Sequence, residues 1–226
     1  MVMTFDLNGE AERLCQYFGV LWLEDADQNL QGKGAVRLDH FVGYRSRANY
    51  RSPASVARFI RRTLPFEFEG ANDLPGRGVG VTRYDDAQEQ ARLVGKIVDN
   101  LLDQRFRYED IVVLTTRHTV RPDAPRSPLN DAARAGRHML ARFTNEYDLF
   151  GNQVVTQGRL RFESVYRFKG QQAPAVILID VDPAAESLLH DQRVLFSGMT
   201  RATVRLELVV SAANRLNNGF SSFDRG

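Results

Sequence analysis

The stretch ESVYRFKGQQAPAVILIDVDPAAESLLHDQRVLFSGMTRATVRLELVVS, residues 163–211, decides the fold of this chain. Within it, an apolar run at 175–179 follows the turn Lys169-Gly170, a helix-like segment ends in FSGMTRA at 196–202, and a β-rich run covers 204–210. Alternation of strand, helix and strand, with small and polar residues at the joints, is typical of a parallel sheet. We therefore predict an α/β fold built on a mainly parallel sheet flanked by helices.

Further elements are predicted on the N-terminal side of this stretch. A long helix is expected to open at Asp85-Asp86 and to reach about Gln104, because its apolar residues recur at helical spacing. An earlier helix is expected to run to about Thr63, with Ser52 as its N-cap and Pro53 at its first helical position. The other expected elements are strands at 19–23, 79–84, 111–114, 153–156 and 161–165, and a helix at 131–147.

Composition indicates an ordinary globular chain. It has 226 residues, of which 43% are hydrophobic and 26% charged, and no apolar run reaches the roughly 18 to 20 residues that cross a bilayer. We therefore expect a cytoplasmic protein without membrane contact. Cys15 is the only cysteine, which excludes an intrachain disulfide, and the four histidines lack metal-ligand spacing. No metal site is expected.

Arginine dominates the basic residues. Only three of the 30 cationic side chains are lysine, a bias that genomic base composition explains for most positions. Six arginines nevertheless fall within residues 45–62, interleaved with Tyr44, Tyr50 and Phe59, a pattern that is also compatible with a phosphate-facing surface. For Arg58, Arg61 and Arg62 we favour the simpler interpretation, a solvated helix face.

The loop that usually holds phosphates, GxxxxGK[ST], does not occur in this sequence. The pairs Gly32-Lys33 and Gly95-Lys96 are not followed by Ser or Thr, and the glycines of residues 76–80 precede a predicted strand, which indicates a turn. Arg51 and Arg201 instead lie where the chain turns at small residues. A guanidinium suits a phosphoryl group held by another domain, although an arginine of this kind taken alone is more often a salt-bridged surface residue.

Four blocks of the sequence, in order, resemble the second motor domain of superfamily 1 helicases of the UvrD/Rep type. DADQ at 25–28 is similar to that family's third motif and NYRSP at 49–53 to its fourth. SVYRFKGQQ at 164–172 is similar to the fifth motif, and FSGMTRA at 196–202 to the sixth. The resemblance extends over nearly everything after about residue 20.

The resemblance implies a RecA-like domain that lacks its own phosphate loop and works against a first RecA-like domain. ATP with Mg²⁺ would be clamped between the two, residues 36–226 forming the second domain and residues 1–35 a remnant of the first or an extension. Arg51 and Arg201 would be catalytic arginine fingers, and Gln28 would sense the γ-phosphate. By the same resemblance, the nucleotide would also contact Gly170 and Gln172. Nucleic acid would contact Ser164, Tyr166, Arg167 and Lys169. The turn at Lys169-Gly170 would couple the nucleotide's state to the strand.

Three positions depart from the family's pattern. Gln171 and Gln172 stand where the fifth motif has Leu and Glu, so ribose recognition would lack a carboxylate. Tyr166 replaces the usual His and keeps an aromatic ring that can stack on a base. Residues 29–34 lack the aromatic platforms that often follow the third motif.

Two functions remain open from the sequence. The first is the C-terminal motor half of an ATP-dependent DNA helicase or translocase, acting on single-stranded or duplex DNA, or on RNA, with an N-terminal domain as its partner. On that view this chain alone should not turn over ATP. The alternative is a stand-alone helicase-like module that binds nucleic acid or protein without ATPase activity. A hydrolase or transferase with its own site is disfavoured, because no nucleophile and base occur at recognisable spacing.

Overall fold

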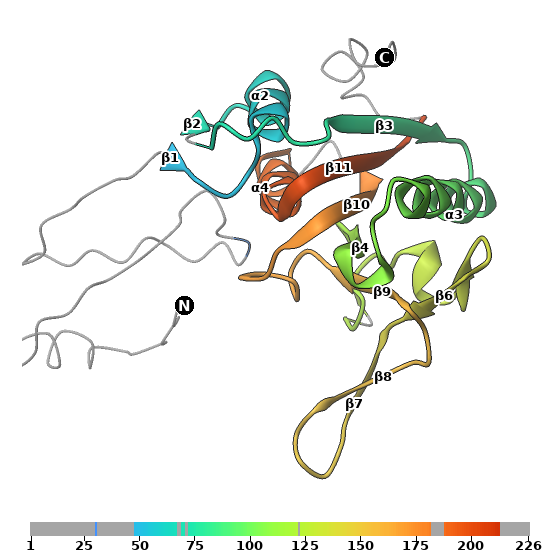
Figure 1. Ribbon diagram of the computed structural model, residues 1–226. Coiled ribbons are helices and arrows are strands. Elements are labelled where there is room, and N and C mark those ends of the chain that lie inside the picture. Colours follow the sequence, from blue (N-terminus) through green and yellow to red (C-terminus); the bar gives the residue numbers. More distant parts are fainter. Residues whose placement is uncertain are drawn as a thin grey trace, which may run out of the picture.

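The computed structural model describes residues 30, 48–66, 69–70, 72–121, 123–181 and 188–212 (Figure 1). The predicted strand at 19–23, Cys15, Gln28 and nearly all of the proposed segment 1–35 lie outside the described residues. None of the described helices is both long and apolar enough to span a membrane.

A seven-stranded sheet forms the centre of the described chain, in the order β3-β11-β10-β4-β9-β6-β5. Every neighbouring pair is parallel except β5 with β6, which confirms the predicted mainly parallel sheet. The strands are β3 (Val79–Tyr84), β4 (Ile111–Thr115), β5 (Arg134–Ala135), β6 (His138–Ala141), β9 (Leu160–Ser164), β10 (Ala173–Val181) and β11 (Ala202–Ser211).

Strand β10 lies between β4 and β11 and is buried along almost its whole length. Its side chains alternate between two hydrophobic cores, because successive residues of a strand point to opposite faces. Val176 and Leu178 enter one core, and Ala175, Ile177 and Ile179 enter the other. The apolar run that the sequence placed at 175–179 is therefore a strand covered on both faces, as a parallel sheet requires.

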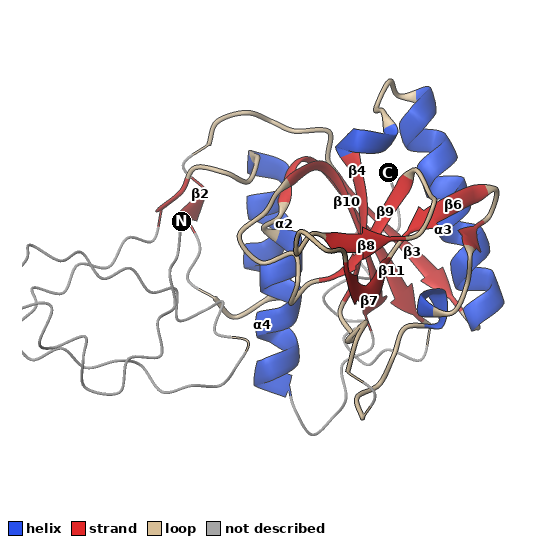
Figure 2. Cartoon of the chain, turned by 90° about the horizontal axis from the view of Figure 1, so that it is seen from below, coloured by secondary structure: helices blue, strands red, loops and turns tan. Residues whose placement is uncertain are grey.

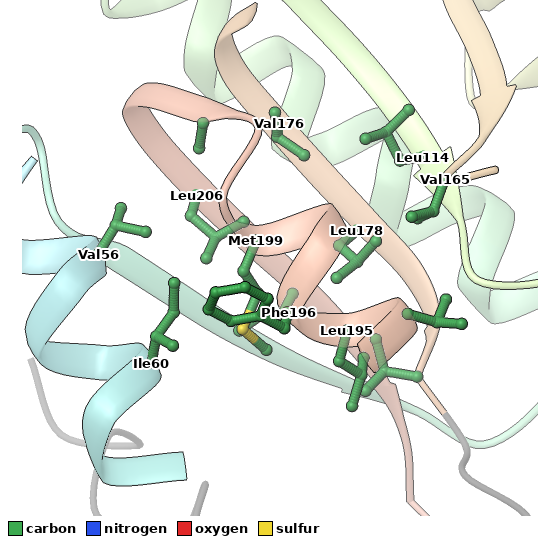
Figure 3. Packing of buried hydrophobic residues seen from close by; sticks show 14 of the residues in the cluster. Val56, Ile60, Leu114, Val165, Val176, Leu178, Leu195, Phe196, Met199 and Leu206 are labelled. Atoms are coloured by element: carbon green, nitrogen blue, oxygen red, sulfur yellow. The ribbon is translucent and has the colours of Figure 1, made fainter. Parts of the chain in front are cut away.

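Helices cover both faces of the sheet (Figure 2). On one side, α2 (Ala54–Thr63) and α4 (Leu188–Met199) pack together, with Val56 and Ile60 of α2 beside Phe196 and Met199 of α4 (Figure 3). On the other side, α3 (Ala87–Asp103) buries Val94, Val98 and Leu101. Two short 3-10 turns, η2 (Tyr108–Asp110) and η3 (Pro128–Asn130), complete this part of the fold.

The start of α3 confirms the sequence prediction, whereas the start of α2 does not. The side chain of Asp86 accepts a hydrogen bond from the Glu89 main chain, which satisfies a free N–H of the first turn. Pro53, rather than Ser52, holds the N-cap position of α2, and the buried Ser52 hydroxyl has no hydrogen-bond partner among the described residues. Asn49 instead organises this turn, because its side-chain oxygen accepts from the main chains of Arg51 and Ser52.

The predicted helix at 131–147 is wrong. The chain there forms β5, β6 and the first strand of a hairpin, β7 (Phe143–Tyr147) with β8 (Gln153–Val155). Burial alternates along β6, where His138 and Leu140 face inward and Met139 outward. Gly136 turns the chain between β5 and β6 with a φ of 56°. Pairing of β6 with β9 and packing against α3 override the local helical pattern.

Two smaller features lie outside the main sheet. A short parallel pair, β1 (Ala48–Asn49) with β2 (Glu69–Gly70), lies beside α2. The β7–β8 hairpin extends away from the sheet at the bottom of the view (Figure 1). Its tip presents the fully exposed Leu149 and the 89% exposed Phe150.

Close approach of two glycines joins α3 to the β5–β6 turn, and this contact is testable. A Cβ on Gly95 would lie 2.8 Å from the Cα of Gly136, closer than real atoms approach. We expect Gly95→Ala to lower the free energy of unfolding by about 1–3 kcal/mol, although alanine alone favours a helix by about 1 kcal/mol. Urea denaturation measures the change, with Lys96→Ala on the exposed side of α3 as the control. A variant as stable as the wild type would contradict the close packing.

Candidate functional site

The amino ends of β10 and β11 bring together two segments that the sequence singled out. Ala173 pairs with Ala202, and the Ala173 main-chain N–H donates to the carbonyl of Arg201 at 3.0 Å. The turn that contains Gly170 and Gln172 directly precedes β10, and Arg201 directly precedes β11. The fold thus places the turn that contains Gly170 and Gln172 beside Arg201.

Arg201 is only 2% exposed, and its guanidinium bonds to its own chain. Its Nε donates to the carbonyl of Ser197 at 2.9 Å, within the last turn of α4. A terminal nitrogen donates to the carbonyl of Gln171 at 3.3 Å. Arg201 therefore bridges the end of α4 and the turn before β10, a more enclosed position than a surface ion pair.

Arg51 lies at the same edge of the sheet but is exposed. The segment after it reaches the edge through Pro53, which packs so closely on Gly76 that a Cβ there would be 2.7 Å away. The next residue, Arg77, donates its main-chain N–H to the Val204 carbonyl near the start of β11. Among the described residues, the Arg51 guanidinium forms no hydrogen bond or ion pair, so it stays available for an external anion.

The turn before β10 is exposed and has one conformational requirement. Gly170 has a φ of 84°, which favours glycine, and a Cβ there would meet nothing within 4 Å. Lys169 and Gln172 are exposed on either side of it, and the Gln171 side-chain oxygen accepts from Arg161 at 2.8 Å. The backbone of this turn is therefore fixed by Gly170 and Gln171, while the side chains of Lys169 and Gln172 face solvent.

Tyr166 lies at the opposite, carboxyl edge of the sheet. Its ring stacks on His118 with centroids 4.1 Å apart, and its hydroxyl shares a 3.0 Å hydrogen bond with His190. Burial, and secondarily the Asp191 carboxylate, raises the pKa of the Tyr166 hydroxyl. Burial, followed by Arg121 and His190, lowers the pKa of His118 and favours its neutral ring. Tyr166 is thus held between two imidazoles.

Arg167 links the segment after β9 to the hairpin. Its Nε donates to Glu163 at 3.0 Å and a terminal nitrogen to Gln153 of β8 at 2.7 Å. Its guanidinium also lies 3.9 Å from the centroid of the Phe143 ring. Ser164 is buried, and its hydroxyl accepts from the Arg167 main chain at 3.3 Å. Ser164 and Arg167 therefore stabilise this turn in the described conformation.

The predicted site residues thus form two groups at opposite edges of the sheet. Ser164 pairs with Thr115 at the carboxyl end of β4, whereas Ala175 pairs with Ile111 at its amino end. The chain crosses from one edge to the other within residues 165–172. Val165 and Phe168 anchor this crossover by packing into the core formed with α2 and α4.

Sequence reasoning missed a buried polar group at the carboxyl edge. Asp180 is 1% exposed and has a φ of 58°, a conformation that is strained for most residues with a side chain. Its carboxylate accepts from Gln90 of α3 at 2.8 Å and from Thr115 of β4 at 2.6 Å. The signal was present, since an aspartate interrupts the apolar residues 175–181. His118 and His190, to which the sequence assigned no chemistry, are the contacts of Tyr166.

The sequence-based expectation of no metal site stays a prediction. In the ranges that the structure describes, no three His, Cys, Asp or Glu side chains gather as a metal site would require.

Comparison with known proteins finds a sequence similarity in the C-terminal part of the sheet. Residues 160–209 match the family model of the UvrD-like helicase C-terminal domain. A solved structure described as the C-terminal domain of a possible DNA helicase from Lactobacillus plantarum WCFS1 has a TM-score of 0.53 at 15% identity, covering 74% of this chain and 91% of that one. The arterivirus nonstructural protein 10 helicase has a TM-score of 0.33 at 17% identity, covering 76% of this chain and 27% of that one. No curated protein matches the chain.

The matched residues 160–209 include β9, the crossover, β10, α4 and most of β11. These elements contain two of the blocks that carried the resemblance in the sequence. The solved helicase domain shares the fold, a mostly parallel sheet with helices that has a RecA-like arrangement. Residues 160–209 of this chain are therefore similar in sequence to the UvrD-like helicase C-terminal domain, and the chain shares its fold with the solved domain from Lactobacillus plantarum.

Proposed function

We propose that residues 36–226 serve as the second motor domain of an ATP-dependent helicase or translocase that acts on nucleic acid. One observation carries the proposal: the residues expected at the nucleotide lie at the amino edge of the sheet, and Ser164, Tyr166 and Arg167, expected at the strand, lie at the carboxyl edge. The crossover 165–172 joins the two edges, and Lys169 lies at its amino-edge end. The nucleotide's phosphates and magnesium would be held mainly by another domain, facing the amino edge of this one.

Arg51 suits the role of a finger that reaches across such a domain boundary. Its guanidinium is exposed and has no partner among the described residues, while its backbone is fixed by the Asn49 side chain. A preorganised backbone with a free cationic fork stabilises charge that develops on a transferring phosphoryl group. Arg51 therefore needs no rearrangement of contacts with the described residues to bind a phosphate.

Arg201 would contribute differently, because its guanidinium already bonds to two carbonyls. The bond from Nε to Ser197 is 2.9 Å and lies within one helix end, whereas the bond to Gln171 is longer, at 3.3 Å. We propose that the Ser197 bond holds the side chain while the Gln171 bond gives way to a phosphate oxygen. The turn before β10 would be released when a phosphate oxygen takes the place of the Gln171 carbonyl. It would be held again when that phosphate leaves.

The crossover then supplies the route between the two edges. Gln171 lies at its amino-edge end, and Tyr166 and Arg167 lie near its carboxyl-edge end. Val165 and Phe168 are buried, so a shift of the crossover would also displace side chains of the packed core. A strand stacked on Tyr166 or bound near Lys169 would sense a change at Arg201 through these few residues. The exposed amide of Gln172 would contact the ribose.

A stand-alone binding module is the second candidate, and the enclosure of Arg201 favours it. A guanidinium that is 2% exposed and bonded to main-chain carbonyls is also suited to a purely structural role. The two candidates differ in whether changes at Arg51 and Arg201 alter ATP turnover, which leads to two predictions.

We expect Arg51→Ala to lower ATP turnover by roughly a thousandfold or more, since that is the range for loss of an arginine finger. The assay uses the complete motor, assembled from this chain and the domain that binds the phosphates, with saturating single-stranded DNA. Arg58→Ala, which removes an exposed arginine of α2, serves as the control and should leave turnover unchanged. Equal turnover in the two variants would favour the binding module.

For Arg201 we expect activity and stability to separate. Arg201→Ala leaves the carbonyls of Ser197 and Gln171 without this donor and should cost about 1–3 kcal/mol of unfolding free energy. Arg201→Lys keeps the charge and one bond but loses the planar fork, so its stability should fall less while turnover still drops at least tenfold. Urea denaturation and steady-state ATPase assays measure the two effects. Arg201→Lys with full turnover would assign the residue a structural role alone.

A further inference from the structure

A polar hollow of about 370 Å³ lies at the base of the hairpin, where Phe143 forms part of its wall. Its walls come from the segment after β4, from η3 and from the start of β7. Three of its lining residues are arginines: Arg121, Arg126 and Arg142. A concave site with converging cations is suited to an anionic ligand.

Arg142 gives the hollow an uncompensated charge. Its terminal nitrogen donates to the main-chain carbonyl of Asn130, and its Nε is buried without a hydrogen-bond partner in the part of the chain that the structure describes. It forms no ion pair with any described acidic residue. A buried N–H without a partner is costly, so a ligand oxygen that reached it would remove that cost.

The other two arginines are only weakly neutralised. Arg121 lies 3.7 Å from Asp123, and Arg126 lies 3.1 Å from Asp131. The two aspartate side chains are 75% and 77% exposed, so water screens both pairs and their mutual attraction is small. The Arg121 guanidinium can therefore turn toward a bound anion at little cost, whereas that of Arg126 also has the Asn130 side-chain oxygen as an acceptor.

Neutral polar groups complete the site. The Thr119 hydroxyl is buried and has no hydrogen-bond partner among the described residues. Asn130 and Asn145 also line the hollow. Guanidinium, hydroxyl and amide groups together match the oxygens of a phosphate group, which accept several hydrogen bonds at once.

Two contacts connect this hollow to the carboxyl-edge residues. Thr119 follows His118, whose ring stacks on Tyr166 at 4.1 Å. Phe143 lines the hollow and also lies under the Arg167 guanidinium at 3.9 Å. A strand that reached Tyr166 and Arg167 would therefore pass close to the hollow.

We propose that this hollow, lined by Arg121, Arg126 and Arg142, binds a backbone phosphate of a single nucleic-acid strand. The inference rests on the proposed function, which brings a strand to Tyr166. Beyond Phe143 on the hairpin, Tyr147 is 59% exposed and its ring centroid is 5.4 Å from that of Phe143. An exposed aromatic ring beside a cationic hollow suits a strand, whose bases stack while its phosphates are bound.

The test compares strand binding by two double variants of this chain. Arg121→Ala with Arg126→Ala removes two cations from the hollow, and Arg61→Ala with Arg62→Ala removes two exposed cations from α2. Fluorescence anisotropy of a labelled oligothymidylate gives the Kd over a series of salt concentrations. We expect the hollow variant to bind roughly tenfold more weakly at low salt and its salt slope to fall by about 0.7, the value for one lost phosphate contact. The α2 variant should match the wild type.

The possible outcomes separate the inference from the function on which it rests. Circular dichroism first verifies that both variants are folded. If both variants bind the strand as the wild type does, the hollow is not a strand site and the inference fails alone. If the wild type binds no strand, both the inference and the nucleic-acid part of the proposed function fail. A parallel titration of the wild type and the hollow variant with inorganic phosphate tests whether the ligand is a free anion instead. If the hollow variant loses phosphate binding but binds the strand as the wild type does, the hollow is a free-anion site and the assignment is overturned.

Discussion

The parallel pairing of β10 with β4 on one side and β11 on the other is the constraint on which the described structure depends. Because β10 is buried on both faces, it fixes where the cores of α2 with α4 and of α3 lie. Its amino end places Arg201 beside the turn that contains Gly170, and near its carboxyl end Asp180 bonds to α3 and β4. A change in the register of this strand would displace both edges together, since a one-residue slip reverses the faces of every side chain.

The two edges have different chemical character. At the amino edge, Arg51 is exposed and unpaired among the described residues, whereas Arg201 is enclosed and bonded to main-chain carbonyls. At the carboxyl edge, Tyr166 and Arg167 are held by aromatic and ionic contacts that extend to the hairpin. A domain arranged in this way suits a function in which one edge meets a phosphate held elsewhere and the other meets a polymer.

Sequence alone predicted the sheet and its helices well where pattern and packing agree. The strands at 79–84 and 111–114, the long helix after Asp86 and the strand–helix–strand unit at 163–211 are confirmed, because their apolar periodicity is the periodicity of burial. The helix predicted at 131–147 is wrong, because the short strand β6 there depends on pairing with β9, which is distant in the chain. The order of strands and turns along the chain indicates at which edge of the sheet a candidate residue lies. It does not predict that Arg201 is enclosed or that a polar hollow forms. Both arise from side chains that only the folded backbone brings together.

The brevity of the crossover at 165–172 has a consequence for how the domain can vary. Eight residues must cover the distance between the two ends of β4 while two of them stay buried and one, Gly170, keeps a left-handed backbone. The two buried side chains and the left-handed Gly170 fix positions along this connection, so an inserted residue would displace at least one of them. Gln172 in place of the Glu of the fifth motif leaves the path intact. The exposed side chains of the turn, Lys169 and Gln172, can therefore vary more freely than the number of residues between the two edges.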